Sequence, residues 1–82
     1  MRISIENRLT GRVYDVEIDP GHTAKDVIDM LVEEGYIPAT PFTDYYWVLV
    51  DPRGIMIDEN VALATRVREG DKLSLVAVFT PG

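Results

Sequence analysis

The chain has no cysteine, a single histidine and two lysines among its 82 residues. Without cysteine it can form neither a disulfide nor a thiolate metal site, and it has no thiol nucleophile. No apolar run approaches the roughly 18 residues of a membrane-spanning helix. Arg2, Glu6 and Arg8 interrupt the segment in which a signal peptide would carry its apolar region. We therefore expect a cytoplasmic protein without membrane insertion.

The charge balance is acidic, with 14 acidic and 8 basic residues and a net charge of −6. A nucleic-acid binder needs clustered Lys and Arg to neutralise phosphates, so this composition disfavours nucleic-acid partners. An acidic surface keeps a small protein soluble and can steer it towards basic partners. The length fits one domain with one core, and we expect that domain to cover residues 1–82.

Alternation of apolar and polar residues predicts a strand-rich chain. The first two predicted strands are joined by a short loop containing Gly11, which is typical of a hairpin. In the last predicted strand, Leu73, Leu75 and Ala77 are expected to face inward. D-P-R-G, from Asp51 to Gly54, has the residues of a type I turn. The predicted strands cover residues 1–5, 12–19, 46–50, 55–57 and 72–79.

A single amphipathic helix is predicted after Thr23, which has the position of an N-cap. Asp26 follows at the spacing of a capping box, and Gly35 is suited to the C-terminal end. Pro38 and Pro41 forbid continuation, so residues 36–44 are expected to form a loop, and a short helical turn is expected near 61–64. The apolar stripe has i, i+3, i+4 spacing and consists of Ala24, Val27, Ile28, Leu31 and Val32. One helix with a sheet indicates an α+β domain of two layers.

Several segments match one known family in order and spacing. They are L-T-G at 9–11, E-G-Y-I-P at 34–38, I-D-E-N-V-A-L at 57–63, and the final eleven residues from Lys72 to Gly82. With these segments the chain resembles the ubiquitin-like β-grasp family over nearly its whole length. The resemblance implies a mixed four- to five-stranded sheet packed on one helix.

The resemblance also implies a function. It is that of a bacterial ubiquitin-like protein modifier, which is not an enzyme and needs no cofactor. An activating enzyme would use ATP to adenylate Gly82, and the partners would be activating, conjugating and deconjugating enzymes and target proteins. Pro81 stands where the family has a second glycine. The implied tail covers residues 78–82, with Val78, Phe79 and Thr80 as its contact residues.

Two other functions are implied by related resemblances. W-V-L-V at 47–50, V-Y-D-V-E-I at 13–18 and V-R-E-G-D-K-L at 67–73 are similar to YukD-like proteins, β-grasp accessories of type VII secretion. Such a module would bind partners without covalent attachment. The C-terminal segment also resembles that of sulfur carriers, in which the final glycine becomes a thiocarboxylate.

A binding patch is expected from the same resemblance. Leu9, Leu49 and Val76 match the positions of the family's recognition patch. All three side chains would face outward if Val48 and Val50 faced inward. Adjacent exposed apolar side chains usually mark a contact site. Trp47 would then lie on the same face as Leu49 and would serve as an aromatic anchor.

No catalytic or metal-binding arrangement is indicated. His22 has no cysteine and no convincing partner for nucleophilic catalysis. Asp15, Glu17 and Asp19 alternate along one predicted strand, a pattern typical of a solvated strand face rather than of a metal site.

Overall fold

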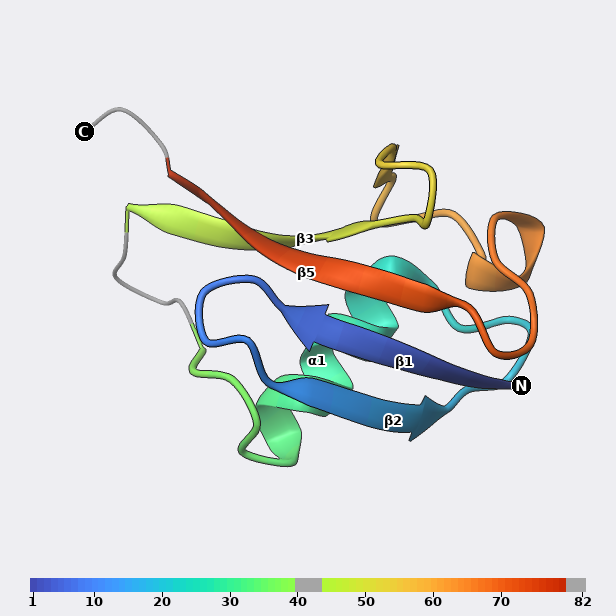
Figure 1. The fold of residues 1–82 in the computed structure, drawn as a ribbon, viewed down its shortest axis with the longest axis horizontal. Helices are drawn as coiled ribbons and strands as arrows, with labels where there is room; N and C mark the ends of the chain where they lie inside the picture. The colour runs from blue at the N-terminus through green and yellow to red at the C-terminus, as the bar shows by residue number, and fades with distance from the viewer. Residues whose placement is uncertain (40–43, 80–82) are drawn as a thin grey trace.

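The computed structural model describes residues 1–39 and 44–79. Within them, five strands form one mixed sheet and one α-helix packs on one of its faces (Figure 1). The strands lie in the order β2-β1-β5-β3-β4. This is the α+β arrangement of a β-grasp fold, as the sequence predicted. The elements are β1 (Arg2–Asn7), β2 (Val13–Glu17), α1 (Ala24–Glu33), β3 (Tyr45–Val50), β4 (Met56–Ile57), a 3₁₀ helix (Leu63–Thr65) and β5 (Lys72–Phe79).

The centre of the sheet joins the first and the last described strands. β1 and β5 run parallel, with Ser4 opposite Lys72 and Asn7 opposite Leu75. The pairs β1–β2, β3–β5 and β3–β4 are antiparallel. β5 therefore pairs with β1 on one side and with β3 on the other, and it forms the centre of the sheet.

The helix begins as the capping pattern predicts. The Thr23 hydroxyl accepts from the Asp26 N–H at 3.1 Å, and the Asp26 carboxylate accepts from the Thr23 N–H at 3.0 Å. These two hydrogen bonds satisfy backbone donors that the first turn leaves unpaired. The bond that the carboxylate accepts from the Thr23 N–H lowers the pKa of Asp26. Gly35 has φ +77°, the left-handed conformation that commonly follows a helix end.

The core lies between the helix and the inner face of the sheet. Leu73 and Leu75, which were predicted to face inward, are fully buried, and so are Ile3 and Ile5 of β1. Ala77 is partly buried against the same cluster. The buried cluster comprises Ile3, Ile5, Ile18, Ala24, Val27, Leu31, Ile37, Trp47, Leu49, Ile57, Leu63, Val67, Leu73 and Leu75. No helix in the described ranges is long and apolar enough to cross a membrane.

Candidate partner-binding face

The face of the sheet opposite α1 is turned towards the viewer in Figure 1, with the helix behind it. Alternation along the strands places one valine row from β3 and one from β5 on this face. Val48 lies directly opposite Val76, and Tyr46 lies directly opposite Val78. The three valines are half-buried and Tyr46 is exposed. These pairs form an apolar surface that α1 does not cover.

Leu9 extends this surface from the β1–β2 loop. Its side chain is 60% exposed. The loop is held in place because the buried side chain of Asn7 accepts from the Leu9 N–H at 2.9 Å, and because the Arg8 N–H donates to Leu75 O at 2.9 Å. The second bond sets the start of the loop beside Val76. We call this surface the outer apolar patch, which consists of Leu9, Tyr46, Val48, Val50, Val76 and Val78.

The prediction that Leu49 and Trp47 belong to an exposed patch is wrong. Leu49 is fully buried opposite Leu75, and Trp47 is 9% exposed opposite Ala77. The Trp47 Nε1–H donates to Pro38 O at 3.2 Å, so the indole is fixed inside the fold. Because side chains alternate along a strand, an error of one residue moved every β3 side chain to the wrong face. Val48 takes the place assigned to Leu49, whereas the outward positions of Leu9 and Val76 are confirmed.

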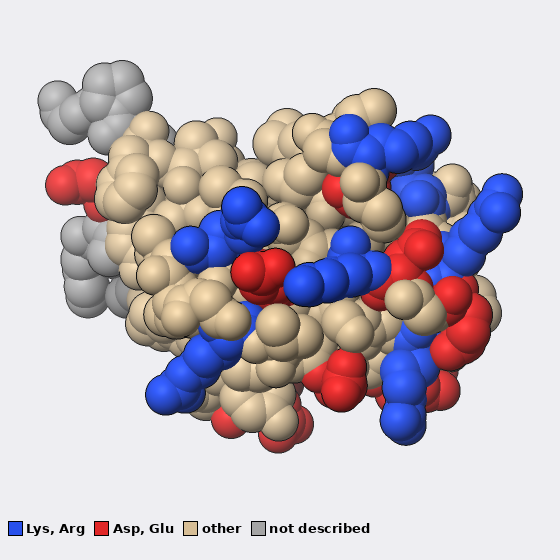
Figure 2. Space-filling model, in the orientation of Figure 1, with Lys and Arg blue, Asp and Glu red and all other residues tan. Residues whose placement is uncertain are grey.

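Charged groups border the outer apolar patch. Glu6 on β1 lies 3.1 Å from Lys72 Nζ and 3.7 Å from Arg8 Nη1. With Val50 and Val76 these residues line a shallow hollow of about 430 Å³. Figure 2 shows several Lys and Arg side chains on this face, together with broad uncharged surface. An apolar centre with a charged border is the composition of many protein-binding surfaces.

The predicted tail begins too early in the sequence. Val78 and Phe79 are the last two residues of β5, where they pair with Tyr46 and Tyr45. The ring of Phe79 also lies 5.6 Å from the ring of Tyr45. Strand pairing therefore continues through Phe79. Thr80, Pro81 and Gly82 lie outside the described residues.

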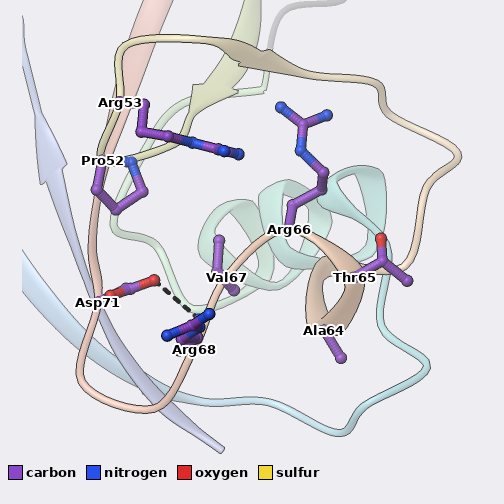
Figure 3. A pocket seen from close by; sticks show the side chains of 8 residues that line it. All are labelled: Pro52, Arg53, Ala64, Thr65, Arg66, Val67, Arg68 and Asp71. Atoms are coloured by element: carbon purple, nitrogen blue, oxygen red, sulfur yellow. Dashed lines mark hydrogen bonds between the residues drawn. The ribbon is translucent and has the colours of Figure 1, made fainter.

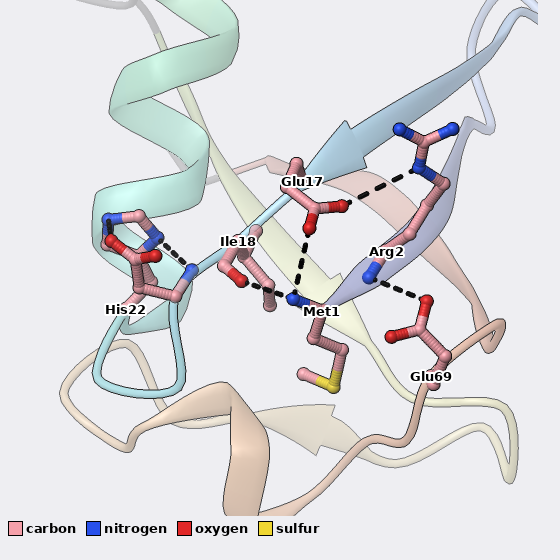
Figure 4. A network of polar contacts seen from close by, with 7 residues as sticks. Met1, Arg2, Glu17, Ile18, His22 and Glu69 are labelled. Carbon is pink, nitrogen blue, oxygen red and sulfur yellow. Dashed lines mark hydrogen bonds and ion pairs between the residues drawn. The ribbon is translucent and has the colours of Figure 1, made fainter.

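His22 and the alternating acidic residues of the second strand make local contacts that stabilise the fold, and Figure 4 shows those of His22 and Glu17. The His22 Nδ1 accepts from the Asp19 N–H at 3.0 Å, which closes the turn after β2. Asp15 accepts from the Ser4 hydroxyl at 3.0 Å, and Glu17 lies 3.5 Å from Arg2 Nε. Among the described residues no group of three or more His, Asp or Glu side chains is arranged to hold a metal ion.

The N-terminal amine is also engaged by the fold (Figure 4). The Met1 α-amine donates to Ile18 O at 2.8 Å and lies 3.4 Å from Glu17 Oε1. The next residue, Arg2, donates its N–H to the Glu69 carboxylate at 2.9 Å. The start of the chain is thus tied to two other segments.

A buried charge cluster at the β3–β4 turn was missed from the sequence. The Asp51 side chain is fully buried and accepts from the Ile55 and Arg53 N–H groups at 2.9 Å. Its Oδ2 also accepts from Nη2 of Arg53 and of Arg66, each at 3.1 Å. The backbone bond from Ile55, followed by the bonds from the two arginines, lowers the pKa of Asp51 to about 2. D-P-R-G predicted the turn but gave no signal for the arginine from a distant segment.

Comparison with known proteins adds no family assignment. The chain matches no protein-family model, and no curated protein matches it. The β-grasp fold is a property of the structure, whereas the ubiquitin-like relationship stays a prediction from the sequence.

Proposed function

We propose that this chain is a ubiquitin-like protein modifier that is joined through Gly82 to amines of target proteins. The observation that carries the proposal is the position of β5. This strand is paired with β1 and β3 and ends at Phe79, three residues before Gly82. Three residues span at most about 10 Å. Gly82 can therefore lie at most this far from the end of β5 while the sheet remains folded, so an activating enzyme would have to bind the domain close to Phe79.

Glycine suits the chemistry that this function requires. An activating enzyme would use ATP to convert the Gly82 carboxylate into an acyl adenylate, and a nucleophile would then attack the carbonyl carbon. Glycine has no Cβ to crowd that carbon. The domain itself would act as the substrate of these steps rather than as their catalyst.

The outer apolar patch would supply recognition by the activating, conjugating and deconjugating enzymes. Exposed apolar surface bordered by charge is typical of a protein contact site. Val48 and Val76 lie at its centre, opposite one another on two paired strands, so their spacing is fixed before a partner arrives. This preorganisation lowers the entropic cost of binding.

The first test is the intact mass of the protein purified from its natural source, because the proposal requires a free carboxylate on Gly82. The second is ATP–pyrophosphate exchange with adenylating enzymes encoded beside its gene. Deletion of Gly82 should abolish exchange, Gly82→Val should slow it, and Pro81→Gly should leave it unchanged or faster. Equal exchange by the full-length and Gly82-deleted chains would refute the modifier function.

The outer apolar patch also favours a second function, a YukD-like module that binds partners without covalent attachment. Such a module would keep its partners after Gly82 deletion and lose them with Val76→Asp. A sulfur carrier would show a different result, since its purified form would carry sulfur in place of one Gly82 carboxylate oxygen. Intact mass separates that outcome from an isopeptide bond to a target protein.

A further inference from the structure

A hollow beside the β3–β4 turn gathers three of the chain's six arginines. Arg53 comes from the turn itself, while Arg66 and Arg68 come from the segment that follows the 3₁₀ helix. Figure 3 shows Arg53 and Arg66 extending towards one another and Arg68 on the same hollow. The hollow measures about 380 Å³. This concentration of cations occurs in a chain whose net charge is −6.

Two of these guanidinium groups are positioned by the protein before any ligand arrives. Arg53 and Arg66 each donate through Nη2 to Asp51 Oδ2 at 3.1 Å. Because a guanidinium has five N–H donors, this bond leaves several donors on each arginine for another acceptor. The Asp51 side chain is fully buried, whereas those of Arg53 and Arg66 are 68% and 26% exposed. The Asp51 carboxylate therefore holds the guanidinium groups of Arg53 and Arg66 in place, while their remaining N–H donors are free to bind a ligand.

Arg68 supplies a third cation with no carboxylate partner for its guanidinium among the described residues. The one acidic side chain that also lines the hollow is Asp71, whose Oδ2 accepts from the Arg68 N–H at 2.8 Å. The charges of the three guanidinium groups therefore exceed those of the Asp51 and Asp71 carboxylates by one positive charge. Such a site attracts an anion.

We propose that this hollow binds the phosphate group of a phosphate monoester. A carboxylate ligand carries one charge and two oxygens, and one arginine fork is enough to pair with it. A phosphate monoester carries a charge of about −1.5 to −2 and three acceptor oxygens. It therefore matches three guanidinium groups better than a carboxylate does. The hollow is lined by none of the residues of the outer apolar patch, and phosphate binding there does not require the chemistry of Gly82, so the proposal does not depend on the modifier function.

The test is an NMR titration of the ¹⁵N-labelled full chain with inorganic phosphate, against sodium chloride at equal ionic strength. Phosphate should shift the amide signals of Arg53 and of residues 65–68 saturably, and chloride should not. Binding should weaken as the pH falls, because the phosphate takes up a proton and loses its second charge; for a phosphate monoester this occurs near pH 6. Absence of saturable shifts, or equal shifts with chloride, would overturn the proposal.

Two variants test whether the arginines form a site or simply add charge. Arg68→Gln should weaken phosphate binding about tenfold, as expected for loss of a hydrogen bond to a charged group. Arg12→Gln removes the same charge from the exposed β1–β2 loop and should leave the affinity unchanged. Equal weakening by both variants would mean general charge attraction and would overturn the proposal. Thermal midpoints of both variants verify that they are folded.

The source of the phosphate is found by repeating the titration with O-phosphoserine and with ADP. Tighter binding of O-phosphoserine would identify a phosphorylated side chain of a protein, and tighter binding of ADP would identify a nucleotide. Both results support a phosphate site. Failure of all three probes to bind would overturn it and would leave the test of Gly82 unaffected.

Discussion

Arg66 donates a hydrogen bond of 3.1 Å to Asp51, although 15 residues separate them in the sequence. The bond joins the segment after the 3₁₀ helix to the β3–β4 turn. The carboxylate is fully buried, and the arginine side chain is 26% exposed. Removing one partner of a buried charge pair leaves the other uncompensated, so this contact is sensitive to mutation.

Asp51 should make the stability of the fold decrease in acid. Hydrogen bonds, first of all from the Ile55 N–H, lower its pKa from 3.8 to about 2. Since the pKa is lower in the folded state, ionised Asp51 stabilises the fold above its ordinary pKa, and this contribution is lost as the pH falls from 3.8 towards about 2. Asp51→Asn should lower the thermal midpoint at neutral pH, and the difference from the wild type should shrink in acid. Asp15→Asn is the control, because Asp15 is exposed on β2. A difference that stayed constant with pH would contradict this account.

Leu31→Ala should destabilise the domain by about 2–5 kcal/mol, because it leaves a cavity in the core. Leu31 is 1% exposed in the middle of the helix face that packs on the sheet. Glu33→Ala, on the exposed side of the same helix, should change stability by less than about 0.5 kcal/mol. Urea unfolding measures both variants. Equal effects would show that the two helix faces are assigned incorrectly.

Val48 and Leu49 should respond differently to the same substitution. Val48→Asp and Val76→Asp alter the outer apolar patch, so they should cost about 1 kcal/mol and abolish partner binding. Leu49→Asp places a carboxylate in the core and should unfold the domain. Circular dichroism and partner capture measure the two effects. Partner binding by folded Val48→Asp and Val76→Asp would exclude the outer apolar patch as the recognition surface.

The Met1 α-amine should be protected by the fold more strongly than the two lysine amines. It donates to Ile18 O, and the Met1 side chain is 14% exposed, whereas the side chains of Lys25 and Lys72 are 60% and 57% exposed. Acetylation followed by peptide mapping compares each amine in buffer and in urea. Met1 should gain the most reactivity on unfolding. The same reasoning predicts that chains linked through this domain would branch at Lys25 or Lys72.

Local patterns were sufficient to predict the helix and the strands, whereas the β-grasp arrangement of the sheet was predicted from the resemblance to the ubiquitin-like family. Thr23 and Asp26 identified the helix start, and alternation identified the inner residues of β5. β3 was different, because W-V-L-V is apolar at every position and alternation cannot show which side chains face inward. Pairing decides the matter: Leu49 lies opposite Leu75, whose inward direction was already predicted.

The charge cluster could not be predicted for a different reason. The turn residues Asp51 and Arg53 are close in sequence, but Arg66 reaches them only after the chain has formed β4 and the 3₁₀ helix. No local pattern reports such an approach. The arginines of the hollow become recognisable as a group once the tertiary structure places them together.

The parallel pairing of β1 with β5 determines when the sheet can be completed during synthesis of the chain. During translation β1 leaves the ribosome first, while β5, its neighbour at the centre of the sheet, is the last described strand to emerge. Until β5 has been synthesised, β1 can pair only with β2 and β3 only with β4, so one edge of each strand has no partner. We therefore expect the sheet to be completed only after β5 has left the ribosome, since its pairing with β1 is non-local and forms slowly. A nascent chain stalled before Lys72 would leave β1 and β3 with unpaired edges, and it would be open to chaperones and proteases.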